Sequence, residues 1–195
     1  MLYHASPIAN LTELFPRVSN HGKPFVYLSE KRENVLVYLS NAIEKCCREE
    51  GFEHKGIFTK WGSYGFNSEG VLVLDEYYPN ATYETYKGVE GYIYRVSESS
   101  ATVDLEGVPF AKVSESAVRV VSCEYIPDAY EALKEAEAVR KIVLTRYEDN
   151  SSDKLEWIRR TILNEYREAE EKPEYRFFLE RKFGQILKGL RGKNI

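Results

Sequence analysis

The segment "VRVVSCEYIPDAYEALKEAE" (residues 118–137) joins two kinds of predicted structure. Its first half is rich in β-branched residues, which favours a strand, whereas its second half has the spacing of an amphipathic helix. Pro127 and Asp128 separate the two halves. We expect Asp128 to cap the helix, because a carboxylate at this position accepts hydrogen bonds from the amides of the first turn. The segment therefore predicts that a β-rich region ends here and a helical region begins.

Before this boundary the sequence predicts several strands and one clear helix. Residues 2–6 and 25–29 are typical of strands, and residues 29–51 predict a helix that Ser29 caps and Gly51 ends. Five residues of this helix follow an apolar stripe, namely Val35, Tyr38, Leu39, Ala42 and Cys46. Short β-rich runs then alternate with turn residues, at 56–62, 70–78, 91–96, 101–105, 110–113 and 117–126, with one helical turn within 80–88.

After the boundary the sequence predicts helices over residues 128–144, 152–171 and 173–190, with Pro173 in the first turn of the last one. Strands followed by helices, without regular alternation, predict an α+β fold with a mixed or antiparallel sheet and segregated helices. We expect an α+β domain over residues 1–127 and a helical region over residues 128–195 that packs on it.

Composition narrows the classes of function. The chain has 195 residues, a net charge of −4 and 15 tyrosines, and its acidic excess lies before residue 139, which argues against a nucleic-acid-binding surface there. No apolar run is long enough for a membrane span and no segment resembles a secretory signal, so we expect a cytoplasmic protein without membrane contact. The three cysteines, two of them adjacent (Cys46 and Cys47), fit neither a disulfide framework nor a metal pair, and the three histidines lack ligand spacing. We therefore expect no metal, and we expect the adjacent cysteines to pack along their helix.

Four side chains capable of chemistry are spread along the predicted α+β domain. His4 ends the first strand, Tyr27 lies in the second strand, Tyr38 follows eleven residues later and Glu124 lies near the end of the last strand. Each also has a structural interpretation: a hydrogen-bonded histidine, two core tyrosines and a surface carboxylate. Tyr27 shares its strand face with Phe25, because residues two apart point the same way.

In this order and spacing, "LYHAS", "FVYLSEKRENVLVY" and "SCEYIPDAYEAL" resemble the three motifs of the ADP-ribosyltransferase superfamily in its His–Tyr–Glu form. The resemblance implies that His4 bonds the ribose next to nicotinamide and that the backbone of Ala5 clasps the nicotinamide amide. Ser6 would support this loop or bond the ribose, and Tyr27 and Tyr38 would stack on either side of the nicotinamide ring.

The resemblance also implies a catalytic acid, Glu124, which would stabilise the cationic sugar as nicotinamide leaves. Glu115, at the start of the same strand region, is an alternative for this acid. Ala5 departs from the family pattern, which has glycine at that position and so allows a closer backbone approach.

The resemblance implies an NAD-dependent mono-ADP-ribosyltransferase that uses NAD as substrate and an unidentified protein or nucleic acid as acceptor. The alternative is a catalytically degenerate module of the same fold that binds a nucleotide or a protein partner. A carboxylate that faces the same cleft as His4 and the two tyrosines would distinguish the transferase from the module. Related chemistry on RNA 2′-phosphate is a third option, although no set of basic residues for it is identifiable in the sequence. The sequence leaves the oligomeric state open.

Overall fold

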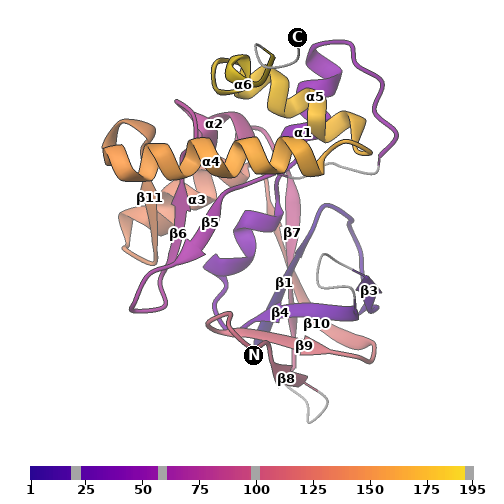
Figure 1. Ribbon diagram of the computed structural model, residues 1–195. Coiled ribbons are helices and arrows are strands. Elements are labelled where there is room, and N and C mark those ends of the chain that lie inside the picture. The colour runs from indigo at the N-terminus through magenta and orange to yellow at the C-terminus, as the bar shows by residue number, and fades with distance from the viewer. Residues whose placement is uncertain (19–22, 57–60, 98–101, 192–195) are drawn as a thin grey trace. The chain divides into compact units, whose positions relative to one another are not determined.

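The computed structural model describes residues 1–18, 23–56, 61–97 and 102–191, and it has an α+β fold (Figure 1). The chain forms two compact units, each built from separate stretches of sequence. The first unit comprises Met1–Leu39, Tyr64–Leu74 and Tyr86–Val143, and the second comprises Ser40–Ser63, Asp75–Thr85 and Leu144–Ile195. This division differs from the expected one at residues 127 and 128. No helix in the described ranges combines the length and apolarity that crossing a membrane requires.

The first unit contains an eight-stranded sheet, counted over the described residues. Its order is β2-β10-β7-β1-β4-β9-β8, and β3 pairs with β4. The strands are β1 (Leu2–Ser6), β2 (Glu13–Leu14), β3 (Arg17–Val18), β4 (Pro24–Ser29), β7 (Gly91–Val96), β8 (Thr102–Asp104), β9 (Ala111–Ser114) and β10 (Val118–Ile126). Most of the predicted strands are confirmed; the one predicted over residues 56–62 lies largely outside the described residues.

The central strand β1 has two unequal neighbours. It pairs with β7 over its whole length, from Leu2 to Ser6, whereas its pairing with β4 is at Tyr3 and Ser29. On one face of the sheet, alternating apolar residues of β1, β2, β4, β7 and β10 form a core. It consists of Leu2, Leu14, Val26, Leu28, Val96 and Val118. The residues between them, Tyr27 among them, therefore point to the opposite face.

The prediction of one continuous helix over residues 29–51 is wrong, because the chain forms two shorter helices there. A 3₁₀ helix, η1 (Glu33–Tyr38), is followed by α1 (Ala42–Glu49). Between them Leu39 and Asn41 leave helical geometry, with ψ of 59° and φ of −138° respectively. The break coincides with the boundary between the two units, so η1 and α1 pack into different cores.

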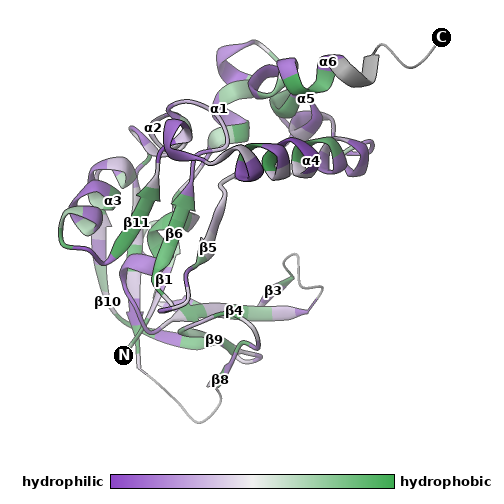
Figure 2. Ribbon diagram, turned by 60° about the vertical axis from the view of Figure 1, so that its left-hand side comes forward, coloured by the Kyte–Doolittle hydropathy of each residue, from purple (hydrophilic) through white to green (hydrophobic). Residues whose placement is uncertain are grey.

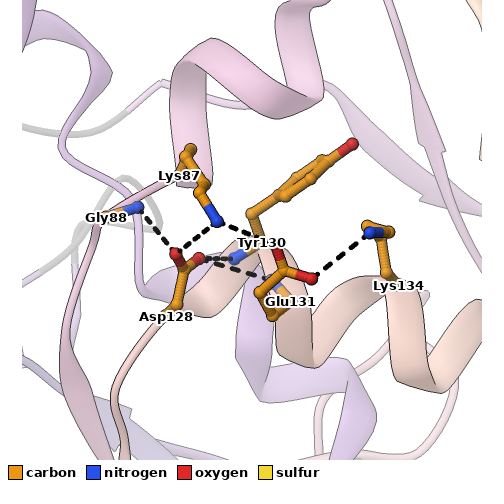
Figure 3. Close-up of polar contacts among 6 residues, drawn as sticks. All are labelled: Lys87, Gly88, Asp128, Tyr130, Glu131 and Lys134. Atoms are coloured by element: carbon orange, nitrogen blue, oxygen red, sulfur yellow. Dashed lines mark hydrogen bonds and ion pairs between the residues drawn. The ribbon is translucent and has the colours of Figure 1, made fainter.

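Asp128 caps α3 (Ala129–Ala138), as predicted, and it also joins that helix to the turn at Lys87 and Gly88, which precedes β7 (Figure 3). Its carboxylate accepts hydrogen bonds from the backbone N–H groups of Tyr130 at 3.0 Å, Glu131 at 3.3 Å and Gly88 at 3.2 Å. The Nζ atom of Lys87 lies 3.1 Å from Asp128 and 2.7 Å from Glu131. One polar cluster thus links the start of α3 to the turn before β7.

The helix predicted to reach residue 144 is wrong beyond Ala138. Arg140 takes a left-handed conformation with φ of 58°, which ends the helix, and Ile142–Thr145 form β11. A run of β-branched and apolar residues suits a strand better than a helix end. This strand forms a three-stranded sheet with β5 (Tyr64–Phe66) and β6 (Leu72–Asp75), in the order β11-β6-β5. Figure 2 shows that β6 and β11 are hydrophobic along most of their length.

Helices dominate the second unit. It contains α1, most of α2 (Ala81–Tyr86), η2 (Tyr147–Asp149), α4 (Ser152–Glu168), α5 (Pro173–Lys182) and α6 (Gly184–Arg191). Cys46 and Cys47 are buried among the apolar residues of these helices, which confirms their predicted packing. Pro173 stands in the first turn of α5, also as predicted, but the helix predicted over residues 173–190 breaks at Phe183.

Candidate functional site

A cavity of about 360 Å³ lies in the first unit, on the face of β4 opposite the aliphatic core. Its volume falls in the range of small-molecule sites, roughly 300–1,000 Å³. Its walls come from β4, η1, β5 and the segment that leads into β9. The lining residues are Tyr27, Leu28, Ser29, Asn34, Tyr38, Tyr64, Gly65, Phe66, Leu105, Val108, Pro109 and Ala111.

Three tyrosines from three separate segments give this cavity its aromatic character. The rings of Tyr38 and Tyr64 meet edge to face, with centroids 6.0 Å apart and an interplanar angle of 86°, and their hydroxyl oxygens lie 3.4 Å apart. Tyr27 projects from β4, where Phe25 supports its ring edge-on at 6.0 Å. Burial raises the pKa of the Tyr38 and Tyr64 phenols, so both hydroxyls are neutral hydrogen-bonding groups at physiological pH.

Tyr38 is the last residue of η1, where the buried part of this helix stops. Asn34, Val35, Leu36 and Val37 are all buried in succession, whereas Tyr38 keeps 39% of its surface exposed. Its ring lines the cavity beside that of Tyr64.

The segment between β8 and β9 forms one rim of the cavity. Phe110 adopts a left-handed conformation with φ of 59°, and its carbonyl accepts a hydrogen bond from the Glu30 backbone N–H at 2.8 Å. The Nζ atom of Lys31 lies 3.6 Å from the centroid of the Phe110 ring, a favourable cation–π distance. These contacts hold the rim to the end of β4.

His4 supports the cavity from behind its aromatic wall. Its Nδ1 atom lies 2.9 Å from the backbone carbonyl oxygen of Tyr27. A carbonyl oxygen only accepts hydrogen bonds, so the proton belongs on Nδ1 and the imidazole is oriented by this bond. His4 and Tyr27 are thus directly connected, a contact that the sequence did not predict, and the described lining of the cavity does not include His4.

The other two residues of the first motif are buried in the sheet. Ala5 and Ser6 pair with Ile93 and Tyr92 on β7, and neither contributes to the described lining of the cavity. The Oγ atom of Ser6 accepts a hydrogen bond from the Ile8 backbone N–H at 3.2 Å. Ser6 therefore stabilises the turn after β1.

Glu124 and His4 project from opposite faces of the sheet. The strand register places Glu124 beside Ile93 and Ala5, whereas His4 stands in the next row, beside Tyr94. Because cross-strand neighbours share a face and successive residues alternate, these two side chains point apart. The structure therefore does not bring the predicted acid and the predicted histidine into one cleft.

An arginine holds the Glu124 carboxylate. Arg32, which directly precedes η1, contacts it through two parallel hydrogen bonds, Nη2 to Oε1 at 2.5 Å and Nε to Oε2 at 2.8 Å. The Arg32 guanidinium lowers the pKa of the Glu124 carboxyl below its usual range. The ion pair ties the start of η1 to β10. Glu115, the alternative acid, is exposed between β9 and β10 and does not line the cavity.

The sequence analysis missed Asn34. This residue on η1 is 6% exposed and lines the cavity. Neither its Oδ1 nor its Nδ2 atom has a hydrogen-bond partner among the residues that the structure describes. The available signal was a polar residue directly before the apolar run Val35–Val37, but the expected helix stripe did not include it.

Of the residues singled out from the sequence, the structure brings Tyr27 and Tyr38 together in one cavity and attaches His4 to it through a backbone carbonyl. Ala5, Ser6 and Glu124 lie outside the described lining. Comparison of the chain with protein-family models, with curated proteins and with solved structures finds no match.

Proposed function

We propose that this protein binds NAD, with the nicotinamide ring inserted among Tyr27, Tyr38 and Tyr64. The observation that carries the proposal is the convergence of these three rings on one cavity. A flat, electron-poor and positively charged ring gains both stacking and cation–π attraction from phenol faces. The resemblance of the three sequence motifs to ADP-ribosyltransferases supports NAD as the source of this ring.

Of the two functions that the motifs suggest, the geometry favours the binding module over the transferase. Stabilising a cationic sugar requires a carboxylate close to the ring that departs. Glu124 instead points away from His4 and forms two hydrogen bonds with Arg32, outside the described lining of the cavity. The proposed function is therefore NAD binding by a module of the ADP-ribosyltransferase type.

Transfer chemistry is a second candidate, because one observation favours it. Glu124 lies on the same sheet face as Ala5, and its ion pair with Arg32 is exposed, with 47% of the glutamate side chain accessible. Exposed ion pairs contribute only about 0–1 kcal/mol, so little energy prevents the carboxylate from changing partner.

Titration calorimetry of NAD against three proteins tests the binding proposal. We expect the wild type to bind one NAD and Tyr38→Ala to bind at least about fivefold more weakly, since base–aromatic stacking contributes roughly 1–3 kcal/mol. Tyr83→Ala is the matched control, because Tyr83 is an exposed tyrosine of the second unit that does not line this cavity, and it should bind like the wild type. Equal affinities of the wild type and Tyr38→Ala would contradict the assignment of the cavity.

Release of nicotinamide from bound NAD distinguishes the two candidates. The binding module predicts that bound NAD stays intact in the wild type. Steady release of nicotinamide that is lost in Glu124→Gln would instead establish the transferase candidate.

A further inference from the structure

The side chain of Asn34 is the least satisfied polar group at the cavity. It is buried to more than nine-tenths, and both its carbonyl oxygen and its amide nitrogen lack hydrogen-bond partners within the described ranges of the chain. Buried polar groups are normally hydrogen-bonded, because leaving them unpaired costs free energy. An unpaired carboxamide that lines a cavity is therefore suited to a partner that enters the cavity.

The position of Asn34 is fixed by its neighbours on η1. On one side, Arg32 pairs with Glu124 and Glu33 pairs with Lys141, whose Nζ atom lies 2.6 Å from the glutamate Oε1. On the other side, Val35 and the two residues after it are buried. Asn34 thus lines the cavity from a helix that is fixed on both sides.

The chemistry of the carboxamide defines its partner. It offers one acceptor oxygen and one donor nitrogen side by side, and exchanging the two atoms by a flip of the amide leaves this description unchanged. A ligand that is complementary to this carboxamide has a hydrogen-bond donor beside a hydrogen-bond acceptor in the same plane. A primary carboxamide on an aromatic ring has this arrangement, and the neighbouring walls formed by Tyr27 and Tyr38 accommodate its ring.

We infer that Asn34 recognises the carboxamide of the nicotinamide ring and rejects a carboxylate in its place. This inference rests on the proposed function and assigns the specificity of the site to a side chain on η1. It differs from what the motif resemblance implies, namely an amide clasped by the backbone of Ala5. In this structure Ala5 is buried in the sheet and does not line the cavity, whereas Asn34 does.

The test compares NAD with its nicotinic acid analogue by titration calorimetry. The wild type should prefer NAD by at least about tenfold, because a carboxylate leaves the Asn34 oxygen without a donor and adds a buried charge. Asn34→Leu should reduce this preference severalfold, because leucine offers neither a donor nor an acceptor, and should keep only the part that burial of the charge contributes. Asn34→Asp keeps the size of the side chain and should weaken binding of NAD by about tenfold, through loss of the donor.

Tyr38→Ala is the matched control for this selectivity. It removes a stacking surface and leaves the carboxamide in place, so both affinities should fall while their ratio stays that of the wild type. Thermal unfolding of each variant confirms that it is folded, and Asn34→Asp provides the answer if Asn34→Leu does not fold.

Two results would overturn the inference and leave the proposed function intact: a wild type that binds both compounds equally, or a preference for NAD that is as large in Asn34→Leu as in the wild type. Adenosine also carries a donor beside an acceptor, so tighter Asn34-dependent binding of adenosine than of nicotinamide mononucleotide would overturn the assignment to nicotinamide. A wild type that binds none of these compounds would overturn the proposed function and the inference together.

Discussion

Asn34 is a residue that lowers the stability of the ligand-free protein and is suited to binding a ligand. Its two unpaired polar atoms are buried, and each such group costs about 1–3 kcal/mol when it lacks a partner. Selection for stability alone would replace them with an apolar side chain of similar size. A role in binding a ligand explains why these polar atoms are present beside an aromatic cavity.

Asn34→Leu is therefore expected to increase the stability of the ligand-free protein. The free energy of unfolding should rise by about 1 kcal/mol, since an apolar side chain of similar size leaves no buried polar group unpaired. Urea unfolding followed by circular dichroism measures this change. Asn164→Leu is the control, because Asn164 is exposed on α4 and its replacement should change little. A loss of stability in Asn34→Leu would show that the carboxamide has partners in the free protein.

The ion pair of Glu124 with Arg32 predicts a specific pH dependence. Folding lowers the pKa of Glu124, so the pair stabilises the protein fully above the unfolded value of about 4.3 and loses this contribution as the pH falls through the lower folded value. Both side chains are partly exposed, which limits the coupling to about 0.2–1 kcal/mol. A double-mutant cycle of Arg32→Met and Glu124→Gln measures this coupling at pH 7 and at acid pH. Coupling that persists unchanged in acid would contradict the assignment.

At the scale of the elements, local signals identified most strands and the starts of helices, but they failed where helices end. Asp128 and Pro173 were predictable because capping and first-turn preferences depend on neighbouring residues alone. The end of α3 was not, because Arg140 adopts a left-handed conformation that its residue type does not suggest. The break between η1 and α1 was missed because one apolar stripe appeared to continue through it.

The polar cluster at the start of α3 gives the clearest prediction for an element (Figure 3). Asp128→Ala removes the bonds to the N–H groups of Tyr130 and Glu131 and the ion pair with Lys87. We expect a loss of about 1–2 kcal/mol in the free energy of unfolding, the range for removing an N-cap residue. Glu135→Ala, an exposed change on the same helix, should cost less than about 0.5 kcal/mol. Equal effects of the two substitutions in urea unfolding would contradict the capping role.

At the scale of the whole molecule, the α+β class could be predicted from the sequence, whereas most of the cavity could not. The class depends on the order of strands and helices, which local patterns reveal. The cavity brings together β4 and η1, which are neighbours in the sequence, with β5 and the segment before β9, which are not. Tyr27 and Tyr38 were identifiable from their spacing, but Tyr64 joins them only through the tertiary fold. The opposite orientations of His4 and Glu124 follow from the pairing of β1, β7 and β10, which no local pattern fixes.

The most direct test of the account is to locate NAD on the 22.6 kDa chain by the changes in amide chemical shifts during a titration. We expect saturable changes at Tyr27, Asn34, Tyr38 and Tyr64, because these residues line one cavity. Spectra that stay unchanged with excess NAD, or changes confined to the second unit, would contradict the central claim that this cavity is a nucleotide site.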